Sequence, residues 1–195
     1  MKTGLLLSGG MDSIAIAYWK RPDVAFTIDY GQLSAKGEIQ AARAVCESLE
    51  VHHEVITADC SELGSGDLAG KTPLTLAPVS EWWPFRNQLL LTFAGMRAVS
   101  LSVKTLLFGS VKTDEAHADG RLGFFEVMDK AFSIQEGGLS IVAPAIHLTT
   151  VELIRLSGVP LSLLGWAHSC HMFDFACGNC RGCFKYLSVM KELSV

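Results

Sequence analysis

Short apolar runs alternate along the chain with longer stretches in which apolar residues recur at helical spacing. The short runs predict strands at Gly4–Leu7, Val24–Ile28, His53–Ile56, Thr105–Phe108 and Ser140–Val142. The longer stretches predict helices over Met11–Lys20, Ser34–Leu49, Phe85–Leu101 and Phe124–Gln135, a helix from Thr149 or Thr150, and a last helix after Cys170–Cys183. Strands that alternate with helices are typical of parallel sheets with crossover helices. We therefore predict the α/β class, with an open, doubly wound, mainly parallel sheet of five strands.

Two stretches between these elements lack periodicity. Residues 59–84 are rich in Gly, Ser and Pro, which predicts a long loop, and residues 110–122 are polar. A long loop in a compact domain is often functional or mobile. Ligands of doubly wound sheets bind beyond the carboxyl ends of the strands. Residues that follow the predicted strands are therefore the first candidates for chemistry.

Composition narrows the class of protein. The chain has 195 residues, of which 49% are hydrophobic and 18% charged, so it can bury a core and is not a disordered chain. We predict a single domain over residues 1–195. The formal net charge is −4 and no basic stripe is present, so we expect a small-molecule substrate and no nucleic acid. No apolar run has the length of a membrane span or of a secretion signal, so we expect no membrane partner and a cytoplasmic location.

The loop Ser8–Ser13, with the sequence SGGMDS, follows the first predicted strand and opens the first helix. Gly9 and Gly10 let the backbone turn and present successive N–H groups to an anion. The positive end of the helix dipole points at the same place. The two serine hydroxyls add donors, and Asp12 can hold magnesium directly or through water. A tight turn with a capping serine is the simpler alternative, but the whole hexapeptide favours pyrophosphate bound to Mg²⁺.

Four cysteines lie close together near the C-terminus, at Cys170, Cys177, Cys180 and Cys183. Four thiolates at this spacing can close a tetrahedral site, and zinc is the usual occupant. Since sulfur fills every position, the metal would be structural. An iron–sulfur cluster is the main alternative, and His168 or His171 is near enough along the chain to replace one cysteine. We predict Zn²⁺ bound by the four cysteines in a C-terminal helical extension at 166–195.

With these motifs the chain resembles the 7-cyano-7-deazaguanine synthase family of the N-type ATP pyrophosphatases. The resemblance covers nearly the whole chain. It rests on signatures that occur in the same order: Ser8–Ser13, Thr27–Gln32, Pro84–Asn87, Gly109–Asp114, Asp119–Arg121, Ala143–Leu148 and the four cysteines. It implies a Rossmann-like sheet of the adenine nucleotide alpha hydrolase type and, because family members often pair, a homodimer.

The resemblance also implies a reaction. The carboxylate of 7-carboxy-7-deazaguanine would attack the α-phosphorus of ATP, and ammonia would convert the acyl adenylate to an amide. In the family a second adenylation turns the amide into the nitrile of 7-cyano-7-deazaguanine. Catalytic roles are implied for Asp12, Arg86, Asp119 and Arg121, with Asp119 on the guanine-like edge and Arg121 on the carboxylate or a phosphate. The residues implied to bind ATP and its Mg²⁺ are Ser8, Gly9, Gly10, Asp12, Ser13, Ile28, Asp29, Tyr30, Asn87, Gly109 and Asp114.

Departures from the family lie on the substrate side. The chain has HADGR at 117–121 where the family has Tyr-Pro-Asp-Cys-Arg, in a shorter loop, and Thr150 stands where the family has a lysine. One alternative is therefore a repurposed ligase that couples a deazapurine acid to another amine, such as a protein N-terminus in a bacterial defence system. Others are a non-catalytic nucleotide-binding subunit and a tRNA thiolation enzyme, although the latter needs a basic RNA-binding surface.

Overall fold

The computed structural model describes residues 1–193, which contain one five-stranded sheet. Its strands are β1 (Thr3–Leu6), β2 (Val24–Asp29), β3 (His52–Thr57), β4 (Thr105–Leu107) and β5 (Ser140–Val142). They lie in the order β3-β2-β1-β4-β5, and all neighbouring strands are parallel. The predicted fold class is confirmed, and the ends of each strand lie within one residue of the prediction.

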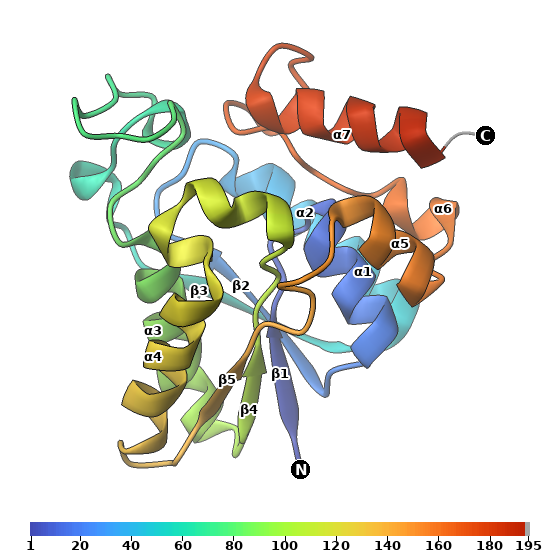
Figure 1. Ribbon diagram of the computed structural model, residues 1–195. Coiled ribbons are helices and arrows are strands. Elements are labelled where there is room, and N and C mark those ends of the chain that lie inside the picture. The colour runs from blue at the N-terminus through green and yellow to red at the C-terminus, as the bar shows by residue number, and fades with distance from the viewer. Residues whose placement is uncertain (194–195) are drawn as a thin grey trace.

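Helices cover both faces of the sheet (Figure 1). They are α1 (Met11–Lys20), α2 (Ala35–Leu49), α3 (Arg86–Ser100), α4 (Leu122–Ser133), α5 (Thr150–Ser157), α6 (Leu161–Leu164) and α7 (Arg181–Leu193). Helices α3 and α4 pack on one face, whereas α1, α2 and α5 pack on the other. Helix α7 lies beyond the carboxyl ends of the strands, where Figure 1 shows it at the top of the molecule. Within residues 1–193 no helix combines the length and the apolar character that crossing a membrane requires.

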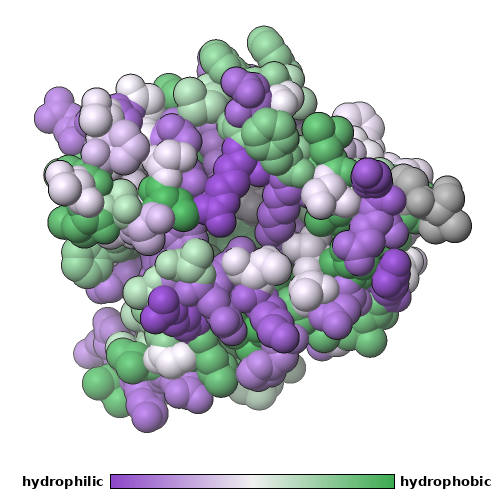
Figure 2. Space-filling model, turned by 45° about the horizontal axis from the view of Figure 1, so that its top comes forward, coloured by the Kyte–Doolittle hydropathy of each residue, from purple (hydrophilic) through white to green (hydrophobic). Residues whose placement is uncertain are grey.

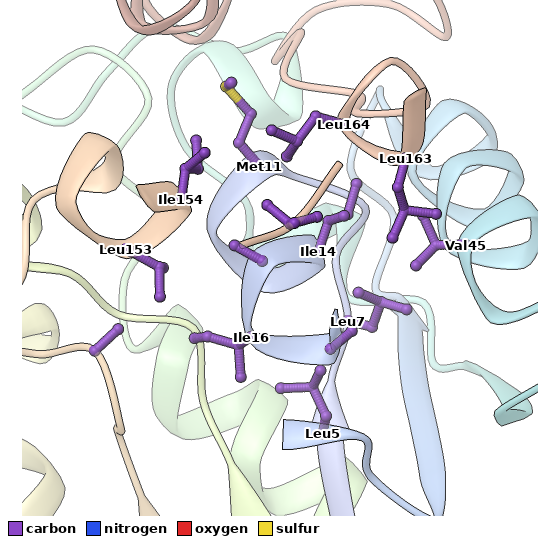
Figure 3. Close-up of a cluster of buried hydrophobic side chains, with 14 of the residues drawn as sticks. Leu5, Leu7, Met11, Ile14, Ile16, Val45, Leu153, Ile154, Leu163 and Leu164 are labelled. Atoms are coloured by element: carbon purple, nitrogen blue, oxygen red, sulfur yellow. The ribbon is translucent and has the colours of Figure 1, made fainter. Parts of the chain in front are cut away.

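The alternation of side chains along β1 divides the core into two layers. Leu5 belongs to the layer with α1 and α5, and Leu6 belongs to the layer with α3 and α4. Helix α1 lies between α2 and α5, and its residues Ile14 and Ile16 are completely buried (Figure 3). Each buried side chain of this size stabilises the fold by about 1.5–3 kcal/mol. The start of α1 is therefore held firmly at the carboxyl end of β1.

The order of the strands reverses direction at β1. The chain runs outward from β1 through β2 to β3 and then returns to place β4 on the other side of β1. The connections after β1 and β4 therefore leave the sheet on opposite faces, and a crevice remains between them. A Cβ atom added to Gly109, just after β4, would lie 3.4 Å from Ser13 Cα. The chain thus comes close to the start of α1 at this point.

Two local details refine the sequence prediction. Ser34 precedes α2 as expected, but its hydroxyl donates to Glu38 Oε1 at 2.6 Å and does not cap the helix backbone. The loop at 59–84 contains two 3-10 turns, Ser61–Leu63 and Asp67–Ala69. This loop folds over the carboxyl ends of β2 and β3 and is anchored there by buried Leu68.

Candidate active site

A cavity of about 840 Å³ opens beyond the carboxyl ends of β1 and β4. Residues of loop 59–84 and of α7 contribute to its wall. Figure 2 shows a hollow on this side of the molecule with hydrophilic side chains around it. A smaller recess of about 130 Å³ shares Ser8, Gly10 and Asp12 of the loop Ser8–Ser13, the candidate phosphate loop, with the cavity. It is also lined by apolar Phe26, Ile28, Leu90 and Phe108. The apolar recess beside a polar cavity suits a planar base joined to a charged group.

The structure brings most of the predicted site residues to these two spaces. The lining residues among them are Ser8, Gly10, Asp12, Ser13, Ile28, Tyr30, Arg86, Asn87, Gly109 and Asp114. Two others lie outside both linings: Gly9 is buried within its loop, and the carboxylate of Asp29 accepts a hydrogen bond from the N–H of Gly31. Asp119 and Arg121 also lie outside both linings. The roles assigned to these residues stay predictions.

The phosphate loop presents free donors to the cavity. Gly9 has a positive φ of 77°, and Gly10 is extended and leads directly into α1. The hydroxyl of Ser13 donates to Gly10 O at 2.9 Å and lies 3.3 Å from the hydroxyl of Ser8. No side chain within residues 1–193 caps α1, so the N–H groups of its first turn are available to an anion.

We expect Gly9→Ala to lower the free energy of unfolding by about 2–5 kcal/mol. The left-handed backbone costs an L residue about 1–2 kcal/mol. The added Cβ would also lie 2.8 Å from both Ala41 Cβ and Glu38 O, and such overpacking costs about 1–3 kcal/mol. Urea denaturation measures the loss. Gly158→Ala is the control, because its φ is 65° and nothing lies within 4 Å of an added Cβ. Equal losses in both variants would contradict the steric role of Gly9.

Lys185 of α7 reaches the phosphate loop. Its Nζ lies 2.8 Å from Asp12 Oδ2 and 3.8 Å from Asp114 Oδ1. Burial disfavours the charge of Lys185, but the two carboxylates outweigh this effect and raise its pKa above the ordinary value. Burial raises the pKa of Asp114, and the nearby Lys185 opposes that shift. The second oxygen of Asp12, Oδ1, is buried and has no partner within residues 1–193. Such an orphaned oxygen indicates a place for a cation or a donor.

The four cysteines meet at the start of α7. Their Sγ atoms all lie within 4.8 Å of one another, at 3.8 Å for Cys177 and Cys183 and 3.9 Å for Cys170 and Cys180. A tetrahedral zinc ion with Zn–S bonds of about 2.3 Å separates its sulfurs by about 3.8 Å. The N–H of Asn179 donates to Cys177 Sγ and lowers the pKa of that thiol to about 7. The compact set of thiols fits one zinc ion, and neither His168 nor His171 belongs to it.

Comparison with known proteins identifies the family. The family model described as "Queuosine biosynthesis protein QueC" matches residues 2–193. The chain belongs to the QueC family. It is 31% identical to the 7-cyano-7-deazaguanine synthase of Methanosarcina barkeri, over 100% of this chain and 96% of that protein. It is also 31% identical to the synthase of Hahella chejuensis, over 96% and 87%, and 32% identical to that of a Nostoc species, over 100% and 95%.

Membership of the QueC family confirms the resemblance and the prediction that the chain is an enzyme. Among solved structures, that of NMN synthetase from Francisella tularensis matches 88% of this chain and 68% of its own, at 17% identity and a TM-score of 0.49. At this level of similarity the match says nothing about function.

Asp119 and Asn87, which the QueC resemblance singled out, form hydrogen bonds with each other at the start of α3. Asp119 accepts the N–H of Asn87 on Oδ2 at 3.2 Å, and its carbonyl accepts Asn87 Nδ2–H at 2.8 Å. A carboxylate at a helix N-terminus is favourable because it satisfies free N–H groups there. Asp119 thereby orients Asn87, which lines the cavity. Arg121 donates to Glu115 O at 2.9 Å and is exposed.

Gly120 accounts for part of the departure from the QueC pattern. It is buried in the 3-10 turn Ala118–Gly120, which packs on the turn Lys112–Ala116. A Cβ at this position would lie 2.5 Å from the carbonyl oxygen of Asp114. The two turns lie so close together that a larger side chain at position 120 would displace Asp114.

Sequence reasoning missed several charged residues of the cavity wall, among them Glu81, Arg181 and Lys185. Glu81 lies in the aperiodic loop, where no pattern indicates which side chain points inward. Lys185 follows the last cysteine by two residues and is flanked by Phe184 and Tyr186. A charged residue between two aromatic residues was the sequence signal that could have pointed to Lys185.

Proposed function

We propose that this protein adenylates the carboxylate of 7-carboxy-7-deazaguanine with ATP, converts the acyl adenylate to an amide with ammonia, and carries the amide on to 7-cyano-7-deazaguanine. One observation carries the proposal. The uncapped start of α1, the two serine hydroxyls and the orphaned oxygen of Asp12 meet at the floor of a cavity of about 840 Å³. This arrangement supports binding of a magnesium-bound polyphosphate next to a second ligand.

ATP fits the two connected spaces in one orientation. The apolar recess between Ile28 and Phe108 would take the adenine, and Gly10 would direct the phosphates to the start of α1. Glu38 also lines the recess; burial raises the pKa of its carboxyl, while hydrogen bonds from Ser34 and Gln32 oppose the shift. Tyr30 stays protonated, because burial raises the pKa of its phenol well above the ordinary value.

The chain's own charges suit the chemistry at the α-phosphorus. The substrate carboxylate attacks this atom, the bond to the β-phosphate oxygen breaks, and pyrophosphate leaves. Ammonia then attacks the acyl carbon, loses a proton, and AMP departs with its bonding electron pair. Arg86 and Lys185 line the cavity and would offset the negative charge that gathers in both steps. Asp12 and Asp114 would hold Mg²⁺, which supplies charge neutralisation to the phosphates when bound.

Gly120→Ala is expected to weaken the apparent affinity for Mg²⁺ by about 10–100-fold. The added Cβ would push on Asp114 O and so displace the Asp114 carboxylate from Asp12. A magnesium titration of pyrophosphate release measures the effect. Gly123→Ala is the control, because nothing lies within 4 Å of an added Cβ there. An unchanged magnesium dependence in Gly120→Ala would argue against Asp114 as a ligand.

Thr150 favours a second candidate, in which the acyl group passes to a different amine. Its side chain is 3% exposed and lines the cavity, and its Oγ1 has no partner within residues 1–193. A threonine adds no positive charge for the second adenylation, on an amide oxygen that is a weaker nucleophile than a carboxylate. A reaction that stops after one adenylation would suit a ligase that joins the deazapurine acid to another amine.

Pyrophosphate release with 7-carboxy-7-deazaguanine, followed by mass spectrometry of the product, tests both candidates. With ATP and ammonia, a nitrile supports the synthase. An amide alone, or an adenylate that persists until another amine is added, supports the second candidate. No release above the rate without the acid would refute both. Size-exclusion chromatography with light scattering tests the predicted homodimer.

A further inference from the structure

Glu81 is a buried carboxylate to which neither the phosphate loop nor the cysteine site gives a role. The residue is 6% exposed and lines the large cavity. Oε1 forms an ion pair with Arg181 Nη1 at 3.1 Å, and His117 Nε2 lies too far away to donate a hydrogen bond, at 3.9 Å. Oε2 is buried and has no partner within residues 1–193. Because buried carboxylate oxygens are almost always hydrogen-bonded, Oε2 indicates a ligand that brings donors.

The loop holds Glu81 firmly on both sides. Ser80 accepts the N–H of Asp67 on its carbonyl at 2.9 Å and donates its hydroxyl to Asp67 Oδ2 at 2.6 Å. Trp83 is 2% exposed and packs edge-on against Tyr30, with ring centroids 4.9 Å apart. A carboxylate fixed in this way loses little conformational freedom when a ligand binds. Glu81 is thus suited to read the shape and donor pattern of a ligand.

We propose that Glu81 and Arg181 bind the 2-amino-4-oxo edge of the deazaguanine ring, an inference that rests on the proposed function. This edge presents an amino N–H, a ring N–H and a carbonyl oxygen side by side. The Glu81 carboxylate accepts from the two donors, and N–H groups of Arg181 not used by Glu81 donate to the carbonyl. Phe184 also lines the cavity and is 55% exposed, so its ring is free to stack on the heterocycle.

A neutral heterocycle fits this corner better than an ammonium ion. Arg181 pairs with Glu81 and cancels its charge, and Arg86 adds a second positive charge to the same cavity. A third cation would be repelled by both. Asp119, to which the family resemblance gave the guanine edge, already accepts the N–H of Asn87 and lies outside the lining. Glu81 lines the cavity away from the phosphate loop and keeps one oxygen without a partner within residues 1–193.

Binding of 7-deazaguanine and 7-deazahypoxanthine to the full-length, zinc-loaded protein tests the proposal by calorimetry. Both bases lack the carboxylate, so adenylation is not involved. The wild type is expected to bind 7-deazaguanine at least about tenfold more tightly, because 7-deazahypoxanthine lacks the 2-amino donor. Glu81→Gln replaces one acceptor oxygen by a donor. It should weaken binding of 7-deazaguanine about 5–150-fold and remove the preference between the two bases.

Glu62→Gln is the matched control, since it makes the same change at an exposed position of the same loop, outside the lining; it should bind like the wild type. Equal affinity of the wild type for both bases would overturn the proposal without any variant. So would a preference that survives in Glu81→Gln and is lost in Asp119→Asn. Failure of the proposed function looks different, because then the base preference is intact while 7-carboxy-7-deazaguanine elicits no pyrophosphate release.

Discussion

Asp12→Asn is expected to release pyrophosphate about 100–1,000-fold more slowly than the wild type at saturating ATP. The asparagine keeps the size of the side chain but removes the negative charge that Oδ1 and Oδ2 would offer to Mg²⁺. Since Asp12 sits in the first turn of α1, next to the phosphates of the proposed complex, the missing charge acts where charge builds up in the transition state. A steady-state pyrophosphate assay across ATP and Mg²⁺ concentrations measures kcat and KM separately.

Lys185→Met, the second variant of this test, separates the effect of the Lys185 charge on kcat from the effect of Mg²⁺ binding. Lys185 Nζ occupies the space between Asp12 and Asp114, at 2.8 and 3.8 Å. Removing it should lower kcat through the lost cation, yet tighten the apparent binding of Mg²⁺, because a competing positive charge is gone. Lys191→Met, at an exposed position farther along α7, is the control. Normal kcat in both Asp12→Asn and Lys185→Met would refute the proposed centre.

Removal of zinc from the four-cysteine site is expected to lower stability and activity together. A ligand present at a thousand times its Kd stabilises a protein by about 4 kcal/mol, which for this chain length corresponds to a fall in Tm of roughly 8–16 °C when it is stripped. Activity should fall in parallel, because Cys183 and Lys185 share the first turn of α7 and a zinc ion at the four cysteines would hold this helix over the cavity. Differential scanning calorimetry with a chelator, and pyrophosphate release before and after zinc is restored, measure both effects.

Cys180→Ser and Cys60→Ser form the matched pair for this test. Cys180 belongs to the set of four, whereas Cys60 is a half-buried free thiol in another part of the chain. Only the first variant should lose both zinc and activity. A zinc-free protein with wild-type activity would show that Lys185 reaches the phosphate loop without help from the metal.

The sheet and the phosphate loop could be predicted because local patterns determine them. Apolar Leu5–Leu7 followed by Gly9 and Gly10 specifies a buried strand that ends in a tight turn, whatever the rest of the chain does. The four cysteines are similarly local, since they lie within one short segment. These features needed no knowledge of long-range contacts.

The substrate side could not be predicted in the same way. Lys185 meets Asp12 across a separation of 173 residues, and Glu81 is buried in a loop that has no periodicity. Conversely, Asp119 matched a family signature, but its carboxylate is used at the start of α3. Which polar side chain faces the cavity depends on how loops pack, and a sequence pattern does not contain that information.

Loop 59–84 and the segment from His168 to α7 enclose the cavity, yet neither contributes a strand to the sheet. Exposed positions of these two segments can therefore change without altering the hydrogen-bond ladder of the sheet. Natural selection can therefore change the two segments around the cavity almost independently of the phosphate loop and the sheet. Relatives that share the SGGMDS loop should differ most in loop 59–84 and in the segment from His168 to α7. Exchanging these two segments between relatives is a practical route to ligases that use new acids or amines.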